Sequence, residues 1–371
     1  MEVICMLQLF EVSGFKNFCD TVRLDFSDVR DYKFNTECVS NGLIGKAIIY
    51  GKNSIGKSNF GLALFDIVSH LSSSKNVGPH LYDYYLNVES EKKYAEFHYV
   101  FRFGSDIVDY KYRKDEKQSL LCESVSINDE LLYDYDYVTE SGNLSGVNKL
   151  APTLNWEFQD ADCVLKYVIN NTALNNDHPL RQTMRFVNNM LWFRSLDENR
   201  YIGYKSKSDD YFEFMFDDST LREFESFLHS AGIEDNLTVK EGVDGKKALY
   251  FDANPLLPFF RVASNGTRAL YTFFYWYKTA QDVSLMFIDE FDAFYHFELS
   301  ESIVSILEKM ASTQVILTSH NTNLMSNRIM RPDCFFILTK EKLTAFANAT
   351  TRELREGHNL EKLYMSGEFN G

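Results

Sequence analysis

Short apolar runs alternate with amphipathic stretches over much of the chain. The runs predict buried strands, and the stretches carry apolar side chains at helical spacing. The predicted strands are 46–50, 284–288, 314–318 and 333–338, and the predicted helices are 58–71, 266–281, 295–310 and 351–365. Because strands and helices alternate, we expect an α/β fold with a mainly parallel core sheet.

A second pattern, strict alternation of polar and apolar positions, predicts antiparallel strands. Residues 7–12 and 21–27 alternate in this way, and 94–103, 107–113 and 119–127 form an aromatic-rich meander. Residues 237–251 predict a hairpin that turns at Asp244-Gly245. Residues 130–240 are otherwise polar loops, with helices predicted near 180–195 and 219–232.

Composition excludes several classes of protein. Aromatic residues make up 15% of the 371 residues, which excludes a mainly disordered chain. A net charge of −15 disfavours nucleic acid as a partner, since phosphate contacts require a basic surface. The six cysteines are scattered without paired spacing, so neither a zinc ribbon nor a disulfide framework is expected. With no signal peptide and no long apolar run, we expect a cytoplasmic protein without membrane contact.

The strongest motif is residues 51–58, which read GKNSIGKS and lie between a predicted strand and a predicted helix. This is the context of a phosphate-binding loop, in which backbone N–H groups of residues such as Asn53, Ser54 and Gly56 surround phosphate oxygens. In this motif Lys57 reaches the β- and γ-phosphates and Ser58 binds Mg²⁺. The sequence therefore predicts a P-loop NTPase that takes ATP and Mg²⁺.

Two later strands end in polar residues that fit this chemistry. The strand 284–288 is followed by Asp289, placed to hold Mg²⁺, and by Glu290, placed to polarise an attacking water. The strand 314–318 delivers His320 at its carboxyl end, where ligands bind in open α/β sheets. We therefore predict Lys57, Glu290 and His320 as catalytic residues, and Ser58 and Asp289 as metal ligands.

Residues 263–268 (ASNGTR) precede the predicted helix 266–281 and offer backbone donors to an anion. Taken alone, this segment is better explained as a simple helix cap formed by Ser264 or Asn265. If it binds an anion, the natural candidate is the γ-phosphate held by a second copy of the chain.

In this order, the four motifs resemble an ABC-type ATPase head of the SMC and RecF class. The segment GFKNF at 14–18 is similar to the opening strand-turn of such heads, and SNGT at 264–267 resembles their signature motif. More narrowly, IDEFDAFYH, LTSHNTNLM and TRELREGHNLEKLYMSGEF resemble OLD-related stand-alone AAA-family ATPases of phage-defence and toxin–antitoxin operons.

This resemblance implies an ATP-sandwich dimer or higher oligomer. Asn17 and Asp292 would contact nucleotide, Ser264 and Gly266 would act on the partner's nucleotide, and His320 would be the switch histidine. It also implies control of a separately encoded effector, a nuclease or toxin, in antiviral defence. The chain departs from the resemblance in lacking a clear Q-loop glutamine, for which Asn87 and Glu89 occupy the plausible region, and in lacking a Toprim nuclease.

The expected division of the chain follows from the motifs. Residues 1–60 form the first part of the ATPase core, 61–130 a helix and an antiparallel β lobe, and 245–371 the second part of the core. Residues 131–244 form a mostly helical insertion, a candidate sensor or docking region. Two alternatives remain open at this stage: a RecF-like DNA repair ATPase, and a slowly hydrolysing, ATP-bound scaffold that stores a toxin.

Overall fold

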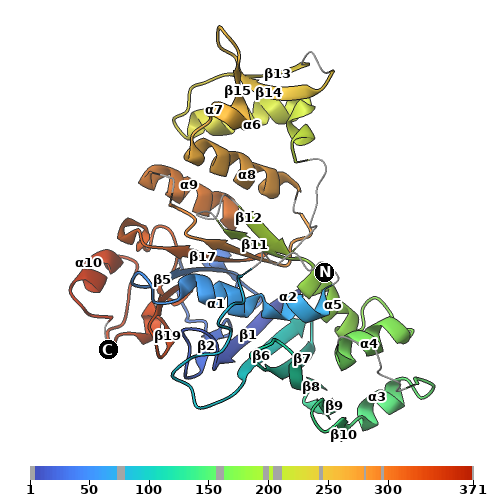
Figure 1. The fold of residues 1–371 in the computed structure, drawn as a ribbon. Helices are drawn as coiled ribbons and strands as arrows, with labels where there is room; N and C mark the ends of the chain where they lie inside the picture. Colours follow the sequence, from blue (N-terminus) through green and yellow to red (C-terminus); the bar gives the residue numbers. More distant parts are fainter. Residues whose placement is uncertain are drawn as a thin grey trace.

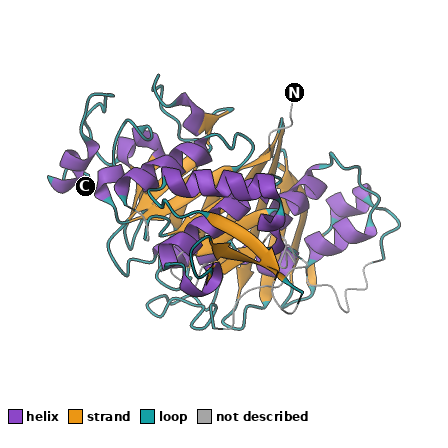
Figure 2. Ribbon diagram, turned by 90° about the horizontal axis from the view of Figure 1, so that it is seen from above, coloured by secondary structure: helices purple, strands orange, loops and turns teal. Residues whose placement is uncertain are grey.

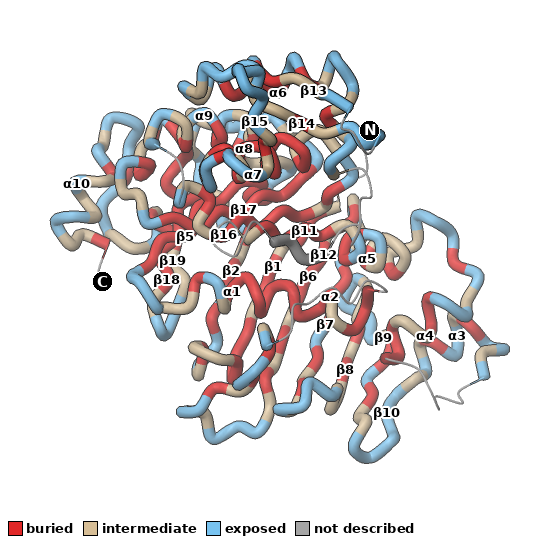
Figure 3. The backbone as a smooth tube through the Cα atoms, turned by 45° about the horizontal axis from the view of Figure 1, so that its top comes forward, coloured by how far each residue is buried: buried red, intermediate tan, exposed pale blue. Residues whose placement is uncertain are grey.

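The chain folds around two large β-sheets with helices between and above them (Figure 1). The computed structural model describes residues 5–72, 80–155, 163–194, 200–203, 211–241, 245–279, 281–293 and 296–369. Seen from above, helices cover the strands (Figure 2). The most buried residues follow the strands of both sheets, and exposed residues gather at the outer loops (Figure 3).

The core sheet has the strand order β12-β11-β16-β17-β5-β18-β19. Strands β11, β16, β17, β5 and β18 run parallel, whereas β12 and β19 pair antiparallel at the two edges. This confirms the predicted α/β fold with a mainly parallel core sheet. The bounds are β5 Lys46–Tyr50, β11 Met190–Arg194, β12 Arg200–Gly203, β16 Leu285–Asp289, β17 Gln314–Ser319, β18 Phe335–Leu338 and β19 Leu343–Ala345.

The second sheet is antiparallel, with the order β10-β9-β8-β7-β6-β1-β2. It contains the predicted meander, and it also takes in the two N-terminal strands. The bounds are β1 Cys5–Ser13, β2 Val22–Asp25, β6 Ala95–Phe103, β7 Asp106–Lys114, β8 Leu120–Ile127, β9 Glu130–Asp136 and β10 Ser141–Asn143. A small hairpin, β3 Val39–Ser40 and β4 Leu43–Ile44, precedes the core strand β5.

Helix α1 (Lys57–Leu64) lies between the two sheets. On one side its Gly61 approaches Phe287 of β16 so closely that a Cβ there would lie 2.6 Å from the Phe287 ring. On the other side Phe60 packs edge-on against Phe10 of β1, and Tyr99 of β6 donates a hydrogen bond to the carbonyl of Ala63. The antiparallel sheet therefore holds α1 against the core sheet.

Gln314 joins the two sheets directly. Its side-chain oxygen accepts a hydrogen bond from the Leu7 N–H at 2.6 Å, and its side-chain nitrogen donates to the Leu7 carbonyl at 2.9 Å. The pairing of β1 with β2 begins at Leu9, so the Leu7 backbone groups have no partner in β2. The buried Gln314 side chain supplies their hydrogen bonds instead.

Helices α8 (Asn265–Thr279) and α9 (Phe297–Glu308) cover the other face of the core sheet. Above α8 lie the helices α6 (Asp218–Ser230) and α7 (Phe259–Val262) and the strands β13 (Leu237–Glu241), β14 (Lys247–Phe251) and β15 (Leu257–Pro258) (Figure 1). The aromatic side chains of α8 pack in this layer: Phe224 of α6 contacts the rings of Tyr271 and Phe274.

Three predicted helices are shorter than the periodicity suggested. The helix predicted at 58–71 breaks at Phe65 into α1 and α2 (Asp66–Leu71). The predicted helix 180–195 is α5 (Pro179–Asn188) followed by strand β11, and 351–365 contains only α10 (Leu360–Met365). For β11 the reason is that an apolar run such as MLWFR has the same pattern in a buried strand as in a buried helix.

The segment 131–244 is less separate than predicted. Its described helices are α3 (Ser145–Leu150), α4 (Val164–Asn171), α5 and α6, but β9 and β10 extend the antiparallel sheet and β11 lies inside the core sheet. The predicted hairpin 237–251 is confirmed as β13 and β14, and Asp244 of its predicted turn lies outside the described residues. Within the described ranges, no helix combines the length and apolar character needed to cross a bilayer.

Candidate nucleotide-binding site

The P-loop connects the carboxyl end of β5 to the start of α1, as the motif predicts. Gly56 precedes the helix with φ 109°, a backbone conformation that favours glycine. Asn53, Ser54 and Ser58 are exposed to solvent at this helix start, whereas Lys57 is buried. The loop therefore presents backbone donors, a hydroxyl group and a lysine at one helix N-terminus, an arrangement suited to phosphate.

Asn17 lies against this loop, although it is 34 residues or more away along the chain. Its side-chain amide donates to the Ser54 carbonyl at 3.5 Å, and its oxygen accepts a hydrogen bond from the Asn59 side chain. A Cβ at Gly56 would lie 3.0 Å from Asn17, so glycine also allows this close approach. The turn 14–18 thus supports the P-loop from outside the core sheet.

Asn87, one of the two residues considered for the Q-loop position, holds the same turn. Its side-chain amide donates to the Lys16 carbonyl at 2.6 Å, and its backbone N–H donates to the Gly14 carbonyl at 2.9 Å. Its side-chain oxygen accepts the Glu89 N–H. In this structure Asn87 therefore supports the turn that carries Asn17.

The two acids at the carboxyl end of β16 lie beside the P-loop. Asp289 is buried, with 7% of its surface exposed, and its Oδ1 accepts a hydrogen bond from the Thr318 hydroxyl at 2.7 Å. Glu290 has φ 47°, in the left-handed region, and its N–H donates to the same hydroxyl at 2.7 Å. Both acids raise the pKa of Lys57 against the larger, opposite effect of its burial, which places them within electrostatic reach of that lysine.

His320 lies between the lysine and the second acid. Its Nε2 is 2.5 Å from the Lys57 Nζ and 3.7 Å from the Glu290 Oε1. Lys57 also donates to the Gly51 carbonyl at 3.3 Å. Burial and, after it, the Lys57 charge lower the pKa of His320, so the neutral imidazole is favoured and Nε2 can accept from the ammonium group.

Asp292 is tied to the same strand end. Its Oδ2 accepts a hydrogen bond from the Ser319 hydroxyl at 2.7 Å, and Ser319 also accepts the Asn321 N–H. Burial raises the pKa of Asp292, and the Ser319 bond opposes that rise. The neighbouring hydroxyls Thr318 and Ser319 therefore hold Asp289, Glu290 and Asp292.

The signature-like segment stands apart from this cluster. Ser264 caps α8, because its Oγ accepts the Thr267 N–H at 3.0 Å, and Gly266 is only partly exposed. In the described residues, no hydrogen bond or ion pair connects Ser264 or Gly266 to the P-loop. Within one chain, therefore, the structure brings together all the predicted site residues except these two.

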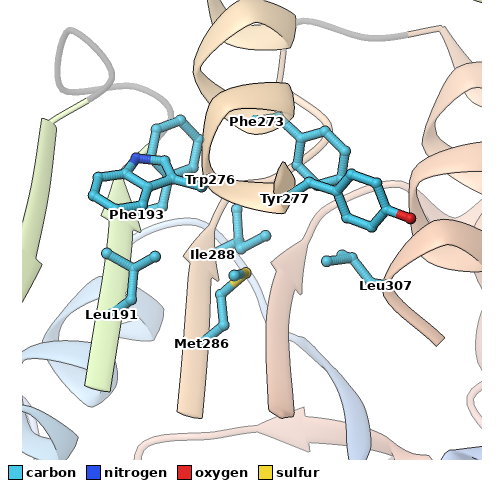
Figure 4. A pocket seen from close by; sticks show the side chains of 8 residues that line it. All are labelled: Leu191, Phe193, Phe273, Trp276, Tyr277, Met286, Ile288 and Leu307. Atoms are coloured by element: carbon cyan, nitrogen blue, oxygen red, sulfur yellow. The ribbon is translucent and has the colours of Figure 1, made fainter. Parts of the chain in front are cut away.

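Strand alternation explains the separation. Phe287 of β16 faces Gly61 of α1, whereas Met286 and Ile288 face α8 on the opposite side of the sheet. Figure 4 shows Met286 and Ile288 pointing toward Phe273, Trp276 and Tyr277 of α8. The space between them is an apolar cavity of about 10 Å³, too small for a nucleotide.

Sequence reasoning missed the roles of three residues here: Thr318, Ser319 and Asn59. Thr318 and Ser319 directly precede His320 in the sequence. Two hydroxyl residues at the end of an apolar strand were the sequence signal that could have indicated their role. Asn59 had no comparable signal, because its partner Asn17 is distant in sequence.

The residues present fit ATP with Mg²⁺. The Lys57 ammonium has three N–H donors, and the described structure gives two of them acceptors, Gly51 O and His320 Nε2. The exposed Ser58 hydroxyl and the Asp289 carboxylate are oxygen donors, the type that Mg²⁺ prefers. Across the described residues, the P-loop region included, no group of three or more His, Cys, Asp or Glu has the geometry of a metal site.

Residues 46–326 match a protein family described as "AAA domain, putative AbiEii toxin, Type IV TA system". The match covers more than half of the chain and contains the P-loop, both acids and His320. The chain belongs to this AAA-domain family. Membership gives the chain an AAA domain, and its P-loop is typical of nucleotide binding. A search of curated proteins found no match.

Solved structures with a similar chain trace include SMC head domains. One is an SMC head bound to the C-terminal winged-helix domain of ScpA, with 13% identity over 92% of this chain and 97% of that chain, and a TM-score of 0.48. Another is the SMC head from Thermotoga maritima, with 13% identity over 92% and 98% of the chains and a TM-score of 0.43. A third, from Pyrococcus furiosus and bound to the C-terminal domain of ScpA, has 14% identity over 92% and 96% and a TM-score of 0.48.

Proposed function

We propose that this AAA-family chain binds Mg·ATP at the P-loop and hydrolyses it. The observation that carries the proposal is the convergence of Lys57, Asp289, Glu290 and His320 at the carboxyl ends of three adjacent parallel strands. Ligands bind at this edge in open α/β sheets. A cation, two acids and an imidazole at a helix N-terminus are the groups that phosphoryl transfer to water requires.

Each residue has a role that its position supports. The P-loop N–H groups and Lys57 bind the phosphates, and Asn17 holds the loop in shape. Ser58 and Asp289 would hold Mg²⁺, which supplies charge neutralisation on the phosphates when bound. Glu290 orients and polarises a water molecule. His320, once released from Lys57 and in the tautomer with its proton on Nε2, donates to the terminal phosphate.

We further propose that two copies close on ATP. Ser264 and Gly266 begin α8 on the face of the sheet opposite α1, so they cannot complete the site of their own chain. The exposed start of α8 is suited to receive the γ-phosphate held by a second copy. Asp292, next to the acids, would lie near that junction.

We propose that the ATP-driven dimer controls a separately encoded effector, a nuclease or toxin, in bacterial antiviral defence. The family description names a toxin–antitoxin system, which supports this context. The net charge of −15 speaks against the RecF-like alternative, in which DNA binding would require a basic surface.

The test is a tagged pull-down from the native host with Glu290→Gln in ATP, followed by mass spectrometry and nucleic-acid detection. Lys57→Ala, which removes the phosphate-binding cation, is the matched control. We expect one stoichiometric protein that is absent from the control. Recovery of DNA without a protein partner would contradict effector control and favour the repair function.

A further inference from the structure

One hydroxyl group, that of Thr318, contacts both predicted acids. Thr318 is fully buried on β17. Its Oγ1 donates to Asp289 Oδ1 at 2.7 Å and accepts the Glu290 N–H at 2.7 Å. The Thr318 carbonyl also accepts the Phe291 N–H at 3.2 Å. A single residue of the neighbouring strand thus holds three consecutive residues, the last residue of β16 and the two that follow it.

The Glu290 backbone needs such support. Its φ of 47° lies in the left-handed region, which costs free energy for a residue with a Cβ and persists only where the surroundings fix it. This turn directs the Glu290 carboxylate toward His320, at 3.7 Å. Without the Thr318 acceptor, the Glu290 N–H would lose its hydrogen bond and the turn its support.

The same bond fixes the orientation of Asp289. Because Oδ1 is engaged by Thr318, the carboxylate cannot rotate freely. Within the described residues, no hydrogen bond is made to Asp289 Oδ2, so this oxygen is available to a cation. Thr318 therefore determines which Asp289 oxygen is presented to the site.

We propose that Thr318 is a positioning residue for ATP hydrolysis. It fixes the position of the Glu290 carboxylate relative to the Asp289 oxygen that is left to bind a cation. This inference rests on the proposed function and names a residue that acts through the two acids without touching the nucleotide. The hydroxyl of Thr318 is its functional group. Thr318→Ser, which keeps the hydroxyl, should therefore retain activity, whereas Thr318→Val, which keeps nearly the same shape without the hydroxyl, should lose it.

Thr313 supplies a matched control. It is also buried, with 2% of its surface exposed, and it precedes the opposite end of β17. Its hydroxyl donates to the Val283 carbonyl at 2.8 Å, so it too connects the β17 segment to the β16 segment. Thr313→Val removes one buried side-chain hydrogen bond far from the acids, whereas Thr318→Val removes two, both to the acids.

The experiment compares wild type, Thr318→Val, Thr318→Ser and Thr313→Val. Three quantities are measured: kcat and KM for ATP, the ATP dissociation constant in EDTA and in Mg²⁺, and the unfolding temperature. We expect Thr318→Val to lower kcat by roughly 10- to 100-fold, the usual effect of a lost hydrogen bond to a charged group. Its ATP affinity in EDTA should stay near wild type, whereas the gain in affinity on adding Mg²⁺ should shrink.

The controls separate positioning from stability. Thr318→Ser should restore both turnover and the Mg²⁺ effect, and Thr313→Val should lower the unfolding temperature without lowering kcat. Equal turnover in Thr318→Val and Thr313→Val would overturn the inference while leaving the proposed function intact. A wild type without any turnover would overturn the proposed function, and this inference with it.

Discussion

Lys57 is a buried cation within electrostatic reach of three carboxylates. Burial lowers its pKa, and Glu290, Asp289 and Asp292 oppose that effect, so the charged form has compensating neighbours. Lys57→Met should weaken ATP binding by at least about 10-fold, because a charge-assisted bond to phosphate is lost. Titration calorimetry measures the change. The exposed Lys52 of the same loop is the control, and an equal loss in Lys52→Met would contradict a specific role.

His70 gives a prediction for pH dependence. It is buried beside Tyr110, with 7% of its surface exposed, and burial, with a smaller effect of the Lys114 charge, lowers its pKa well below 6.5. Below pH 6.5 the unfolded chain therefore binds one proton more than the folded chain at this position. Stability should consequently fall as the pH drops, by up to about 1.4 kcal/mol per pH unit for this group.

The measurement is urea unfolding between pH 5 and pH 8. His70→Phe keeps an aromatic ring next to Tyr112 and removes the titration, so its stability should depend less on pH than that of the wild type. His80, with 83% of its side chain exposed, is the control. If His70→Phe and His80→Phe show the same pH dependence as wild type, the assignment to His70 is wrong.

At the scale of elements, the packing of α1 on β16 fixes the distance between the P-loop and the acids. A Cβ at Gly61 would lie 2.6 Å from Phe287, which is itself fully buried. Gly61→Ala should push the helix off the strand, with a loss of about 1–3 kcal/mol in unfolding free energy and weaker ATP binding. Chemical unfolding and calorimetry measure both effects.

Gly357 provides the control for this helix-packing prediction, because no atom lies within 4 Å of a Cβ built there. Gly357→Ala should leave stability and ATP binding near wild type. The double variant Gly61→Ala/Phe287→Leu should recover part of the loss, since the shorter side chain makes room. A Gly61→Ala protein that matches Gly357→Ala would contradict the packing account.

The elements that can be predicted best from the sequence are those determined by residues close together along the chain. The P-loop lies between β5 and α1, and β16 ends in Asp289, so motif and pattern agree at each place. β11 was missed because MLWFR is a fully apolar pattern that fits a buried helix as well as a strand. Thr318 and Asn59 escaped notice because hydrogen bonds to other strands and turns depend on tertiary contacts.

For the whole molecule, we expect each ATP site to be shared between two chains. Lys57→Ala disables the P-loop, and Ser264→Arg blocks the start of α8. Each variant alone should be inactive. A mixture should regain about a quarter of wild-type turnover, because half of randomly paired dimers hold one intact site. Phosphate release across mixing ratios measures this, and a mixture as inactive as its components would contradict the shared site.

Hydrolysis at this site is tested by phosphate release from wild type and Glu290→Gln, with ATP affinity measured on the same samples. We expect Mg²⁺-dependent turnover in the wild type. In Glu290→Gln we expect ATP affinity near wild type, with turnover at least about 100-fold lower because the group that polarises water is gone. A wild type that releases no phosphate, or a Glu290→Gln variant that turns over as fast as wild type, would contradict hydrolysis at this site.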